Sequence, residues 1–172
     1  MIRKFAVLGT FAAILVSLVG CAPAQTAVTA PVVTDAWIRA IPDTAVDGDM
    51  TGMFMTVENP TGEDIYLTGG TTDGTYTTVD LDAHEVVDDG TGNMVMQPAK
   101  GGILIPAHGS TQLMPGGFHI MFWKLTKPIP VGDVVHARLN FSNGTTVDID
   151  AIAMTVEMGQ EKYVGTVPGM SH

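Results

Sequence analysis

The stretch Val134-Val-His-Ala-Arg-Leu-Asn-Phe141 alternates apolar with polar side chains. Successive side chains of a β-strand point to opposite faces, so this alternation predicts a strand with one face in a core and the other toward solvent. The apolar side chains that would face the core are Val135, Ala137, Leu139 and Phe141. The polar side chains that would face solvent are His136, Arg138 and Asn140.

Similar short apolar segments recur on both sides of this strand, separated by Gly, Pro, Asn and Asp. They cover residues 36–41, 53–57, 65–67, 76–81, 94–96, 103–105, 118–125 and 147–156. None of them continues with the 3.6-residue period of a helix. Many short strands with turn residues between them predict an all-β domain, a Greek-key sandwich or barrel, over residues 35–158.

The N-terminus has the composition of an export signal. The basic segment Met1-Ile-Arg-Lys4 precedes an apolar run from Phe5 to Val19, and Gly20-Cys21 follows as a cleavage site. Leu18-Val-Gly-Cys21 resembles the bacterial lipobox, in which the cysteine is lipidated and becomes the first residue of the mature chain. We therefore expect a signal peptide over residues 1–20 and a lipidated Cys21 with a linker to residue 34. The alternative is an ordinary signal peptide in which Cys21 carries no lipid.

Charge and cysteine content exclude several classes of function. The chain carries a formal net charge of -10, so nucleic acid is not expected as a partner. Cys21 is the only cysteine, which leaves the exported domain without a disulfide or a thiolate. A blue-copper electron-transfer site needs a thiolate and is therefore excluded. Hydrolase signatures such as Gly-x-Ser-x-Gly and His-Glu-x-x-His are absent, and we expect no enzymatic activity.

Histidine and methionine form the sharpest local pattern in Gly116-Gly-Phe-His-Ile-Met-Phe122. In an extended chain, His119 and Met121 lie on the same side, about 6.6 Å apart along the strand. Phe118, Ile120 and Phe122 would face the core, so the His/Met pair is expected on the opposite, exposed surface beside Trp123.

A second candidate pair precedes the first in the chain. From Val79 onward the apolar residues alternate with polar ones, so His84 is expected to point away from the core. Met94 and Met96 follow after an Asp-Gly turn and would share one face. Imidazole nitrogen with thioether sulfur suits a soft cation, and thioethers select Cu(I) over magnesium, calcium or manganese.

These residues resemble the PCuAC family of copper chaperones, whose motif is a histidine, ten intervening residues, a methionine, twenty-one more, and His-x-Met. The motif maps onto His84, Met96, His119 and Met121. The gaps here are eleven and twenty-two residues, one longer each, which leaves open whether Met94 replaces Met96. The segments Ala36-Trp-Ile-Arg39 and Val57-Glu-Asn59 also look like the family, and the resemblance covers residues 35–153.

The resemblance implies a cupredoxin-like fold that binds Cu(I) outside the cytoplasm. The lipid expected on Cys21 would tether the domain to the outer face of the cell membrane. It also implies delivery of copper to the CuA centre of cytochrome c oxidase or to a Sco-type assembly protein. A lipoprotein that only buffers copper, and one that binds no metal, remain alternatives. Residues 159–172 are expected to form a flexible tail in which Met170 and His172 bind a second copper ion or shuttle the first.

Overall fold

The computed structural model describes residues 30–42, 50–155 and 162–163. The expected signal peptide, Cys21 and the tail residues Met170 and His172 lie outside the described residues. The described part is all β, as predicted, and no helix occurs in it. No helix long and apolar enough to cross a membrane is found in this part. Its strands are β1 Val32–Arg39, β2 Thr51–Glu58, β3 Ile65–Thr72, β4 Leu81–Asp88, β5 Met94–Pro98, β6 Ile103–Ile105, β7 Ser110–Leu113, β8 His119–Phe122, β9 Val134–Phe141, β10 Thr146–Met154 and β11 Lys162–Tyr163.

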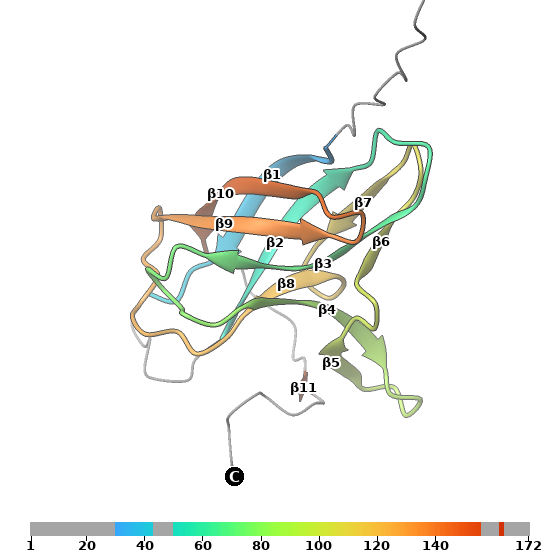
Figure 1. Ribbon diagram of the computed structural model, residues 1–172. Coiled ribbons are helices and arrows are strands. Elements are labelled where there is room, and N and C mark those ends of the chain that lie inside the picture. The colour runs from blue at the N-terminus through green and yellow to red at the C-terminus, as the bar shows by residue number, and fades with distance from the viewer. Residues whose placement is uncertain (1–29, 43–49, 156–161, 164–172) are drawn as a thin grey trace, which may run out of the picture.

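Seven strands form a closed barrel in the order β4-β8-β2-β1-β10-β9-β3, which β3 closes by pairing with β4. The other strands extend this barrel: β5 pairs with β4, β6 with β3, β7 with β2, and β11 with β5 (Figure 1). Among the strand pairs of the described residues, only β1–β10 and β11–β5 are parallel. The wall β8-β4-β5 carries most of the candidate ligands, so its outer face is the one that matters for function.

The barrel interior holds the main hydrophobic core. In β9, Val135, Ala137, Leu139 and Phe141 are buried, while His136 and Arg138 are exposed, as the alternation predicts. Ile38 of β1 and Met53 of β2 are fully buried in the same core. Burying apolar area of this kind is the main favourable term in the free energy of folding.

Two glycines allow the barrel to close. Gly69 and Gly70 of β3 pair with Asp82 and Leu81 of β4. A Cβ atom at Gly69 would collide with the carbonyl oxygen of Leu81, and Gly69 has a φ of 139°, which L residues rarely adopt. The close approach of β3 to β4 therefore requires glycine, and it fixes the position of the strand that carries His84.

Two strands reach beyond residues 35–158, over which the domain is expected. β1 begins at Val32, inside the expected linker, because Val32 and Val33 pair with Glu58 and Val57 of β2. In the expected flexible tail, Lys162–Tyr163 form β11, which pairs with β5.

Candidate metal centre

Strand β8 presents two different faces, as predicted. Ile120 and Phe122 belong to the barrel core, whereas Met121 belongs to a second cluster with Met96 and Trp123. His119 shares the Met121 side of the strand by alternation. The expected separation of the His/Met pair from the core is therefore observed.

The expected exposure of the pair is wrong. The exposed fractions of His119 and Met121 are 3% and 2%. Side chains from elsewhere cover them: Met96 and Trp123 contact Met121, and the half-buried Met50, Val79 and Val86 pack against the cluster. Phe118, expected in the core, is 36% exposed because it precedes the first residue of β8.

Strand β4 places His84 directly opposite His119. The two residues are cross-strand partners in the antiparallel β4–β8 pair, and their ring centroids are 5.8 Å apart. The Trp123 ring lies edge-on to His84, with centroids 5.3 Å apart. His84 is only 1% exposed, so it points away from the barrel core, as predicted, but into this outer cluster rather than into solvent.

Strand β5 contributes the second methionine. Met96 is 6% exposed and contacts Met121 and Trp123, whereas Met94 is 43% exposed and lies outside the cluster. Val86 of β4 is the cross-strand partner of Met96, so the β4–β5 pairing brings this methionine over the outer face. The structure therefore brings together His84, Met96, His119 and Met121.

A pocket of about 290 Å³ opens onto three of these four side chains, namely Met96, His119 and Met121. Met50, Gly52 and Phe54 also line it, whereas His84 does not. Sequence reasoning gave Met50 no role, because it stands far from any histidine along the chain. No local pattern marks Met50. It stands two residues before Gly52, which is the cross-strand partner of Met121, so the β2–β8 pairing places Met50 on the same side as Met121.

The two nitrogen atoms of His119 have different environments. Nδ1 lies 3.0 Å from the carbonyl oxygen of Gly117. A carbonyl only accepts hydrogen bonds, so Nδ1 carries the proton and Nε2 carries the lone pair. Nε2 is buried and has no hydrogen-bond partner among the described residues. This tautomer is the one that metal-binding histidines adopt when a backbone carbonyl orients the ring.

Burial keeps both imidazoles neutral at pH 7. Burial, and to a smaller extent the neighbouring His119, lowers the pKa of His84 to about 4. Burial also lowers the pKa of His119, against the opposing effect of its hydrogen bond to Gly117. The Asp82 carboxylate lies beside the cluster, where its Oδ2 accepts a hydrogen bond from Trp123 Nε1 at 3.0 Å. The four side chains therefore present two neutral imidazoles and two neutral thioethers.

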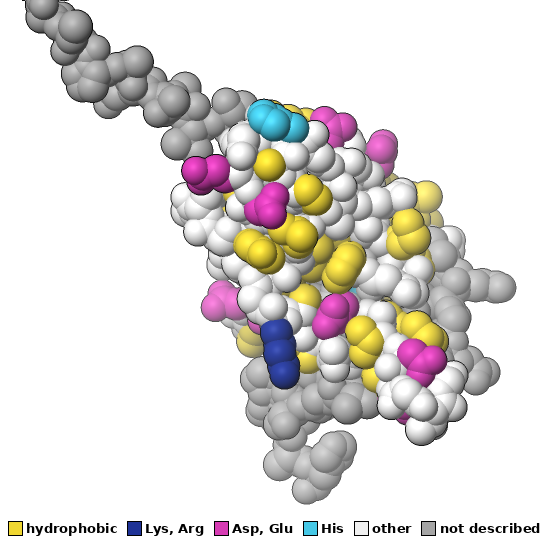
Figure 2. Space-filling model, turned by 90° about the vertical axis from the view of Figure 1, so that its right-hand side faces the viewer, with side chains coloured by type: hydrophobic (Ala, Val, Ile, Leu, Met, Phe, Trp, Pro, Cys, Tyr) yellow, Lys and Arg dark blue, Asp and Glu magenta, His cyan; other side chains and the backbone are white. Residues whose placement is uncertain are grey.

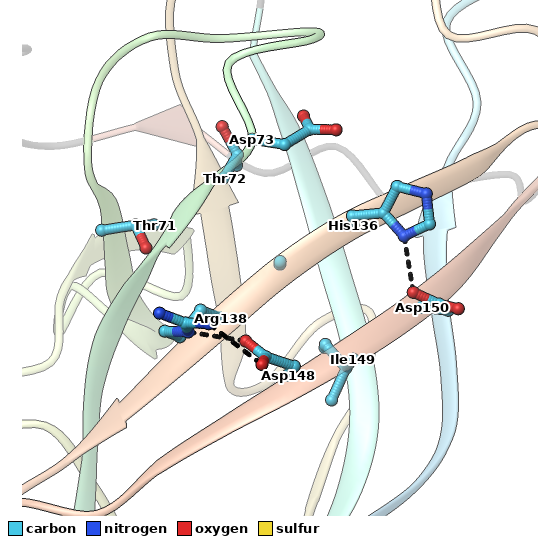
Figure 3. Close-up of a pocket in the computed structure, with 9 residues that line it drawn as sticks. Thr71, Thr72, Asp73, His136, Arg138, Asp148, Ile149 and Asp150 are labelled. Atoms are coloured by element: carbon cyan, nitrogen blue, oxygen red, sulfur yellow. Dashed lines mark hydrogen bonds and ion pairs between the residues drawn. The ribbon is translucent and has the colours of Figure 1, made fainter.

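A different depression, of about 340 Å³, lies over β9 and β10, and Figure 3 shows its lining. Two of its basic side chains form ion pairs there. His136 Nδ1 contacts Asp150 Oδ1 at 2.6 Å, and Arg138 Nε contacts Asp148 Oδ1 at 2.6 Å. The Asp150 carboxylate raises the pKa of His136. Since these groups are exposed and already paired, the depression lacks the desolvated donors found around His119.

A family model and a relative both match most of the chain. The family model described as "Putative lipoprotein LpqE-like" matches residues 32–153. A protein of Leifsonia xyli subsp. xyli named "Putative lipoprotein Lxx21020" is 34% identical over 164 residues, which are 91% of this chain and 93% of the relative.

Solved structures share the fold. "Copper-bound PCuAC domain from PmoF2" has a TM-score of 0.55 at 22% identity and covers 76% of this chain and 97% of that chain. The solution structure of CuI-DR1885 from Deinococcus radiodurans has a TM-score of 0.51 at 26% identity, over 80% of this chain and 85% of that chain. The resemblance to PCuAC domains is thus confirmed in the fold.

The family match extends from β1 almost to the end of β10, and so includes every strand that brings a candidate ligand to the cluster. Together with the similarity to the Leifsonia protein along nearly its whole length, it shows that this chain belongs to the LpqE-like lipoprotein family.

Proposed function

We propose that this chain is an extracytoplasmic Cu(I) carrier that binds one ion through His84, Met96, His119 and Met121. The observation that carries the proposal is the buried Nε2 of His119, which has no hydrogen-bond partner among the described residues. A buried polar atom without a partner costs free energy, and a metal ion at the pocket would offset that cost. Two thioethers on the same outer cluster supply the donors that a soft ion prefers.

The charge of the donors favours the monovalent ion. Desolvating a cation costs free energy that rises steeply with its charge, and neutral donors offer a dication no compensating negative charge. No cluster of three or more His, Cys, Asp or Glu side chains that could hold a metal occurs in the described ranges. Cu(I) bound to thioether and imidazole can pass downhill to a thiolate site, so the same donors that select copper also allow its release.

The proposed destination is another copper protein outside the cytoplasm, either the CuA subunit of cytochrome c oxidase or a Sco-type assembly protein. Lipid on Cys21 would hold the carrier at the outer face of the membrane that contains such a subunit. Figure 2 shows acidic side chains among hydrophobic ones on the side of the barrel where β4 to β7 lie, and the whole chain carries a net charge of -10. Such a surface favours encounter with a partner that is basic around its copper site.

The binding step can be tested by anaerobic titration of the protein with Cu(I) in competition with a chromogenic Cu(I) chelator. We expect one equivalent of tightly bound copper, with affinity reduced at least about tenfold, or about 1.4 kcal/mol, in His119→Gln. His136→Gln is the matched control, because His136 is exposed and pairs with Asp150. Copper binding that is the same in both variants would contradict the assignment of the site.

The delivery step needs a test in cells. Deleting the gene should reduce oxidase activity, and added copper should restore it. Copper sensitivity with normal oxidase activity would instead identify a lipoprotein that buffers copper without a dedicated acceptor.

A further inference from the structure

We propose that Met50 is a third thioether ligand for Cu(I), in addition to the four ligands proposed above, and that it binds the ion from the pocket that Met96, His119 and Met121 also line. The inference rests on the proposed function and extends it, because it concerns a residue outside the four-residue motif. With Met50 as a ligand, the pocket is the route by which Cu(I) enters and leaves the site. His84 does not line the pocket, and its ring centroid lies 5.8 Å from that of His119.

The position of Met50 supports this role. It lines the pocket of about 290 Å³ together with Met96, Met121 and His119, so three thioethers and one imidazole surround the same space. Met50 packs against the cluster of Met96, Met121 and Trp123 and is half-buried, whereas Met96 and Met121 are buried. Among the three sulfurs, Met50 is therefore the one most accessible to an arriving ion.

The local backbone holds Met50 at this place. β2 begins at the next residue, and the Thr51 hydroxyl donates a hydrogen bond of 2.8 Å to the carbonyl oxygen of Arg39. Thr51 and Gly52 pair with Phe122 and Met121 of β8. The backbone beside Met50 is thus fixed to the ligand strand, while three rotatable side-chain bonds let its thioether approach or leave the pocket.

The pocket also depends on a missing side chain. Gly52 lies between Met50 and the Phe54 ring on the outer face of β2, and a Cβ atom there would stand 2.9 Å from Phe54 Cζ. The Phe54 ring therefore packs over Gly52, and Gly52 brings no side chain of its own into the pocket that both residues line. Arg39 lines the same pocket, and its positive charge repels a dication twice as strongly as a monovalent ion.

The test combines ¹³C-methyl NMR of the methionines with Cu(I) affinity, both measured on the full mature chain under anaerobic conditions. On addition of one equivalent of Cu(I), we expect the methyl signals of Met50, Met96 and Met121 to shift. Met50→Leu keeps the apolar volume but removes the sulfur, so the apo protein should keep its melting temperature while Cu(I) affinity falls by about tenfold. X-ray absorption should count one sulfur neighbour fewer around copper in this variant.

Met154→Leu is the matched control, because Met154 is 47% exposed and does not line the pocket. It should change neither copper affinity nor the sulfur count. If Cu(I) shifts Met96 and Met121 while Met50 stays unshifted and Met50→Leu binds normally, Met50 is only a packing residue and the inference is overturned. If the wild type binds no Cu(I) at all, the proposed function fails with it.

Discussion

At the scale of single residues, the site combines a ligand role and a packing role in the same side chains. Met121 is 2% exposed and touches Met96 and Trp123, so replacing it by alanine would both remove a sulfur and leave a cavity. A large-to-small change of this kind costs about 2–5 kcal/mol of unfolding free energy whatever the metal does. A variant that tests the ligand role of Met121 must therefore keep the volume of its side chain.

Met121→Leu meets this requirement. We expect its unfolding free energy to stay within about 1.5 kcal/mol of the wild type, since the swap conserves volume and apolar character. Its Cu(I) affinity should fall by at least about tenfold, because the variant loses one soft donor. Met53→Leu is the control: Met53 is equally buried but belongs to the barrel core, so its copper affinity should be unchanged. Equal affinities in the two variants would remove Met121 from the ligand set.

The lowered pKa of His84 makes the stability of the metal-free protein depend on pH. The folded-state pKa is about 4, below the ordinary value of 6.5, so the unfolded chain binds more protons between these values. Stability should therefore be complete above about pH 6.5 and decrease as the pH falls toward 4. Between pH 7.5 and 5 this group accounts for a loss of about 2 kcal/mol.

Chemical denaturation measures the unfolding free energy of the wild type and of His84→Leu at pH 7.5 and at pH 5. The contributions of the other titratable groups are the same in both proteins and cancel in the comparison. The variant should lose less stability than the wild type between pH 7.5 and 5. The same neutrality predicts that Cu(I) affinity is nearly constant from pH 7.5 to 6. An affinity that fell with the profile of a group of pKa 6.5 would show that His84 is solvated in solution.

At the scale of strands, the position of His84 depends on the closure of the barrel. Gly69→Ala should push β4 away from β3, because the new Cβ would collide with the Leu81 carbonyl at a φ of 139°. We expect a loss of at least about 2 kcal/mol in unfolding free energy and weaker Cu(I) binding, since β4 carries His84. Gly62→Ala is the control, because Gly62 has only an ordinary contact of 3.6 Å with His108 and no positive φ. Wild-type stability in Gly69→Ala would contradict this account of closure.

The features that the sequence could predict are those that depend on a single strand, and the features that it could not predict depend on strand pairing. Alternation identifies the faces of β8 and β9 because it is a local property of the chain, and the opposition of Met121 to Ile120 follows from it. Burial of the outer face could not be predicted, because its cover comes from Met96 on β5, from Trp123, and from Met50 at the start of β2. These pieces meet only through the β4–β5 and β2–β8 pairings, which no local pattern specifies. For the same reason Met50 received no role, while the motif residues did.

At the scale of the whole molecule, the metal site and the barrel core share one strand, so copper binding should stabilise the entire fold. Ile120 and Phe122 of β8 belong to the core, and His119 and Met121, which alternate with them along the strand, face the site. Unfolding of the barrel therefore separates the ligands. Free Cu(I) at about a hundred times its dissociation constant should add about 2.7 kcal/mol to the unfolding free energy. For a domain of this size, that raises the melting temperature by roughly 10 °C.

Thermal unfolding with and without one equivalent of chelator-buffered Cu(I) measures this effect. Met121→Leu at the same free copper concentration should show a smaller increase, and Mg²⁺ should give none, because thioethers do not bind a hard cation. A melting temperature that stayed constant while copper was demonstrably bound would mean that the ion is held by a part of the chain that unfolds independently of the barrel. In that case the cluster could not be the binding site, because His84, His119 and Met121 lie on β4 and β8, which are two paired strands of the barrel.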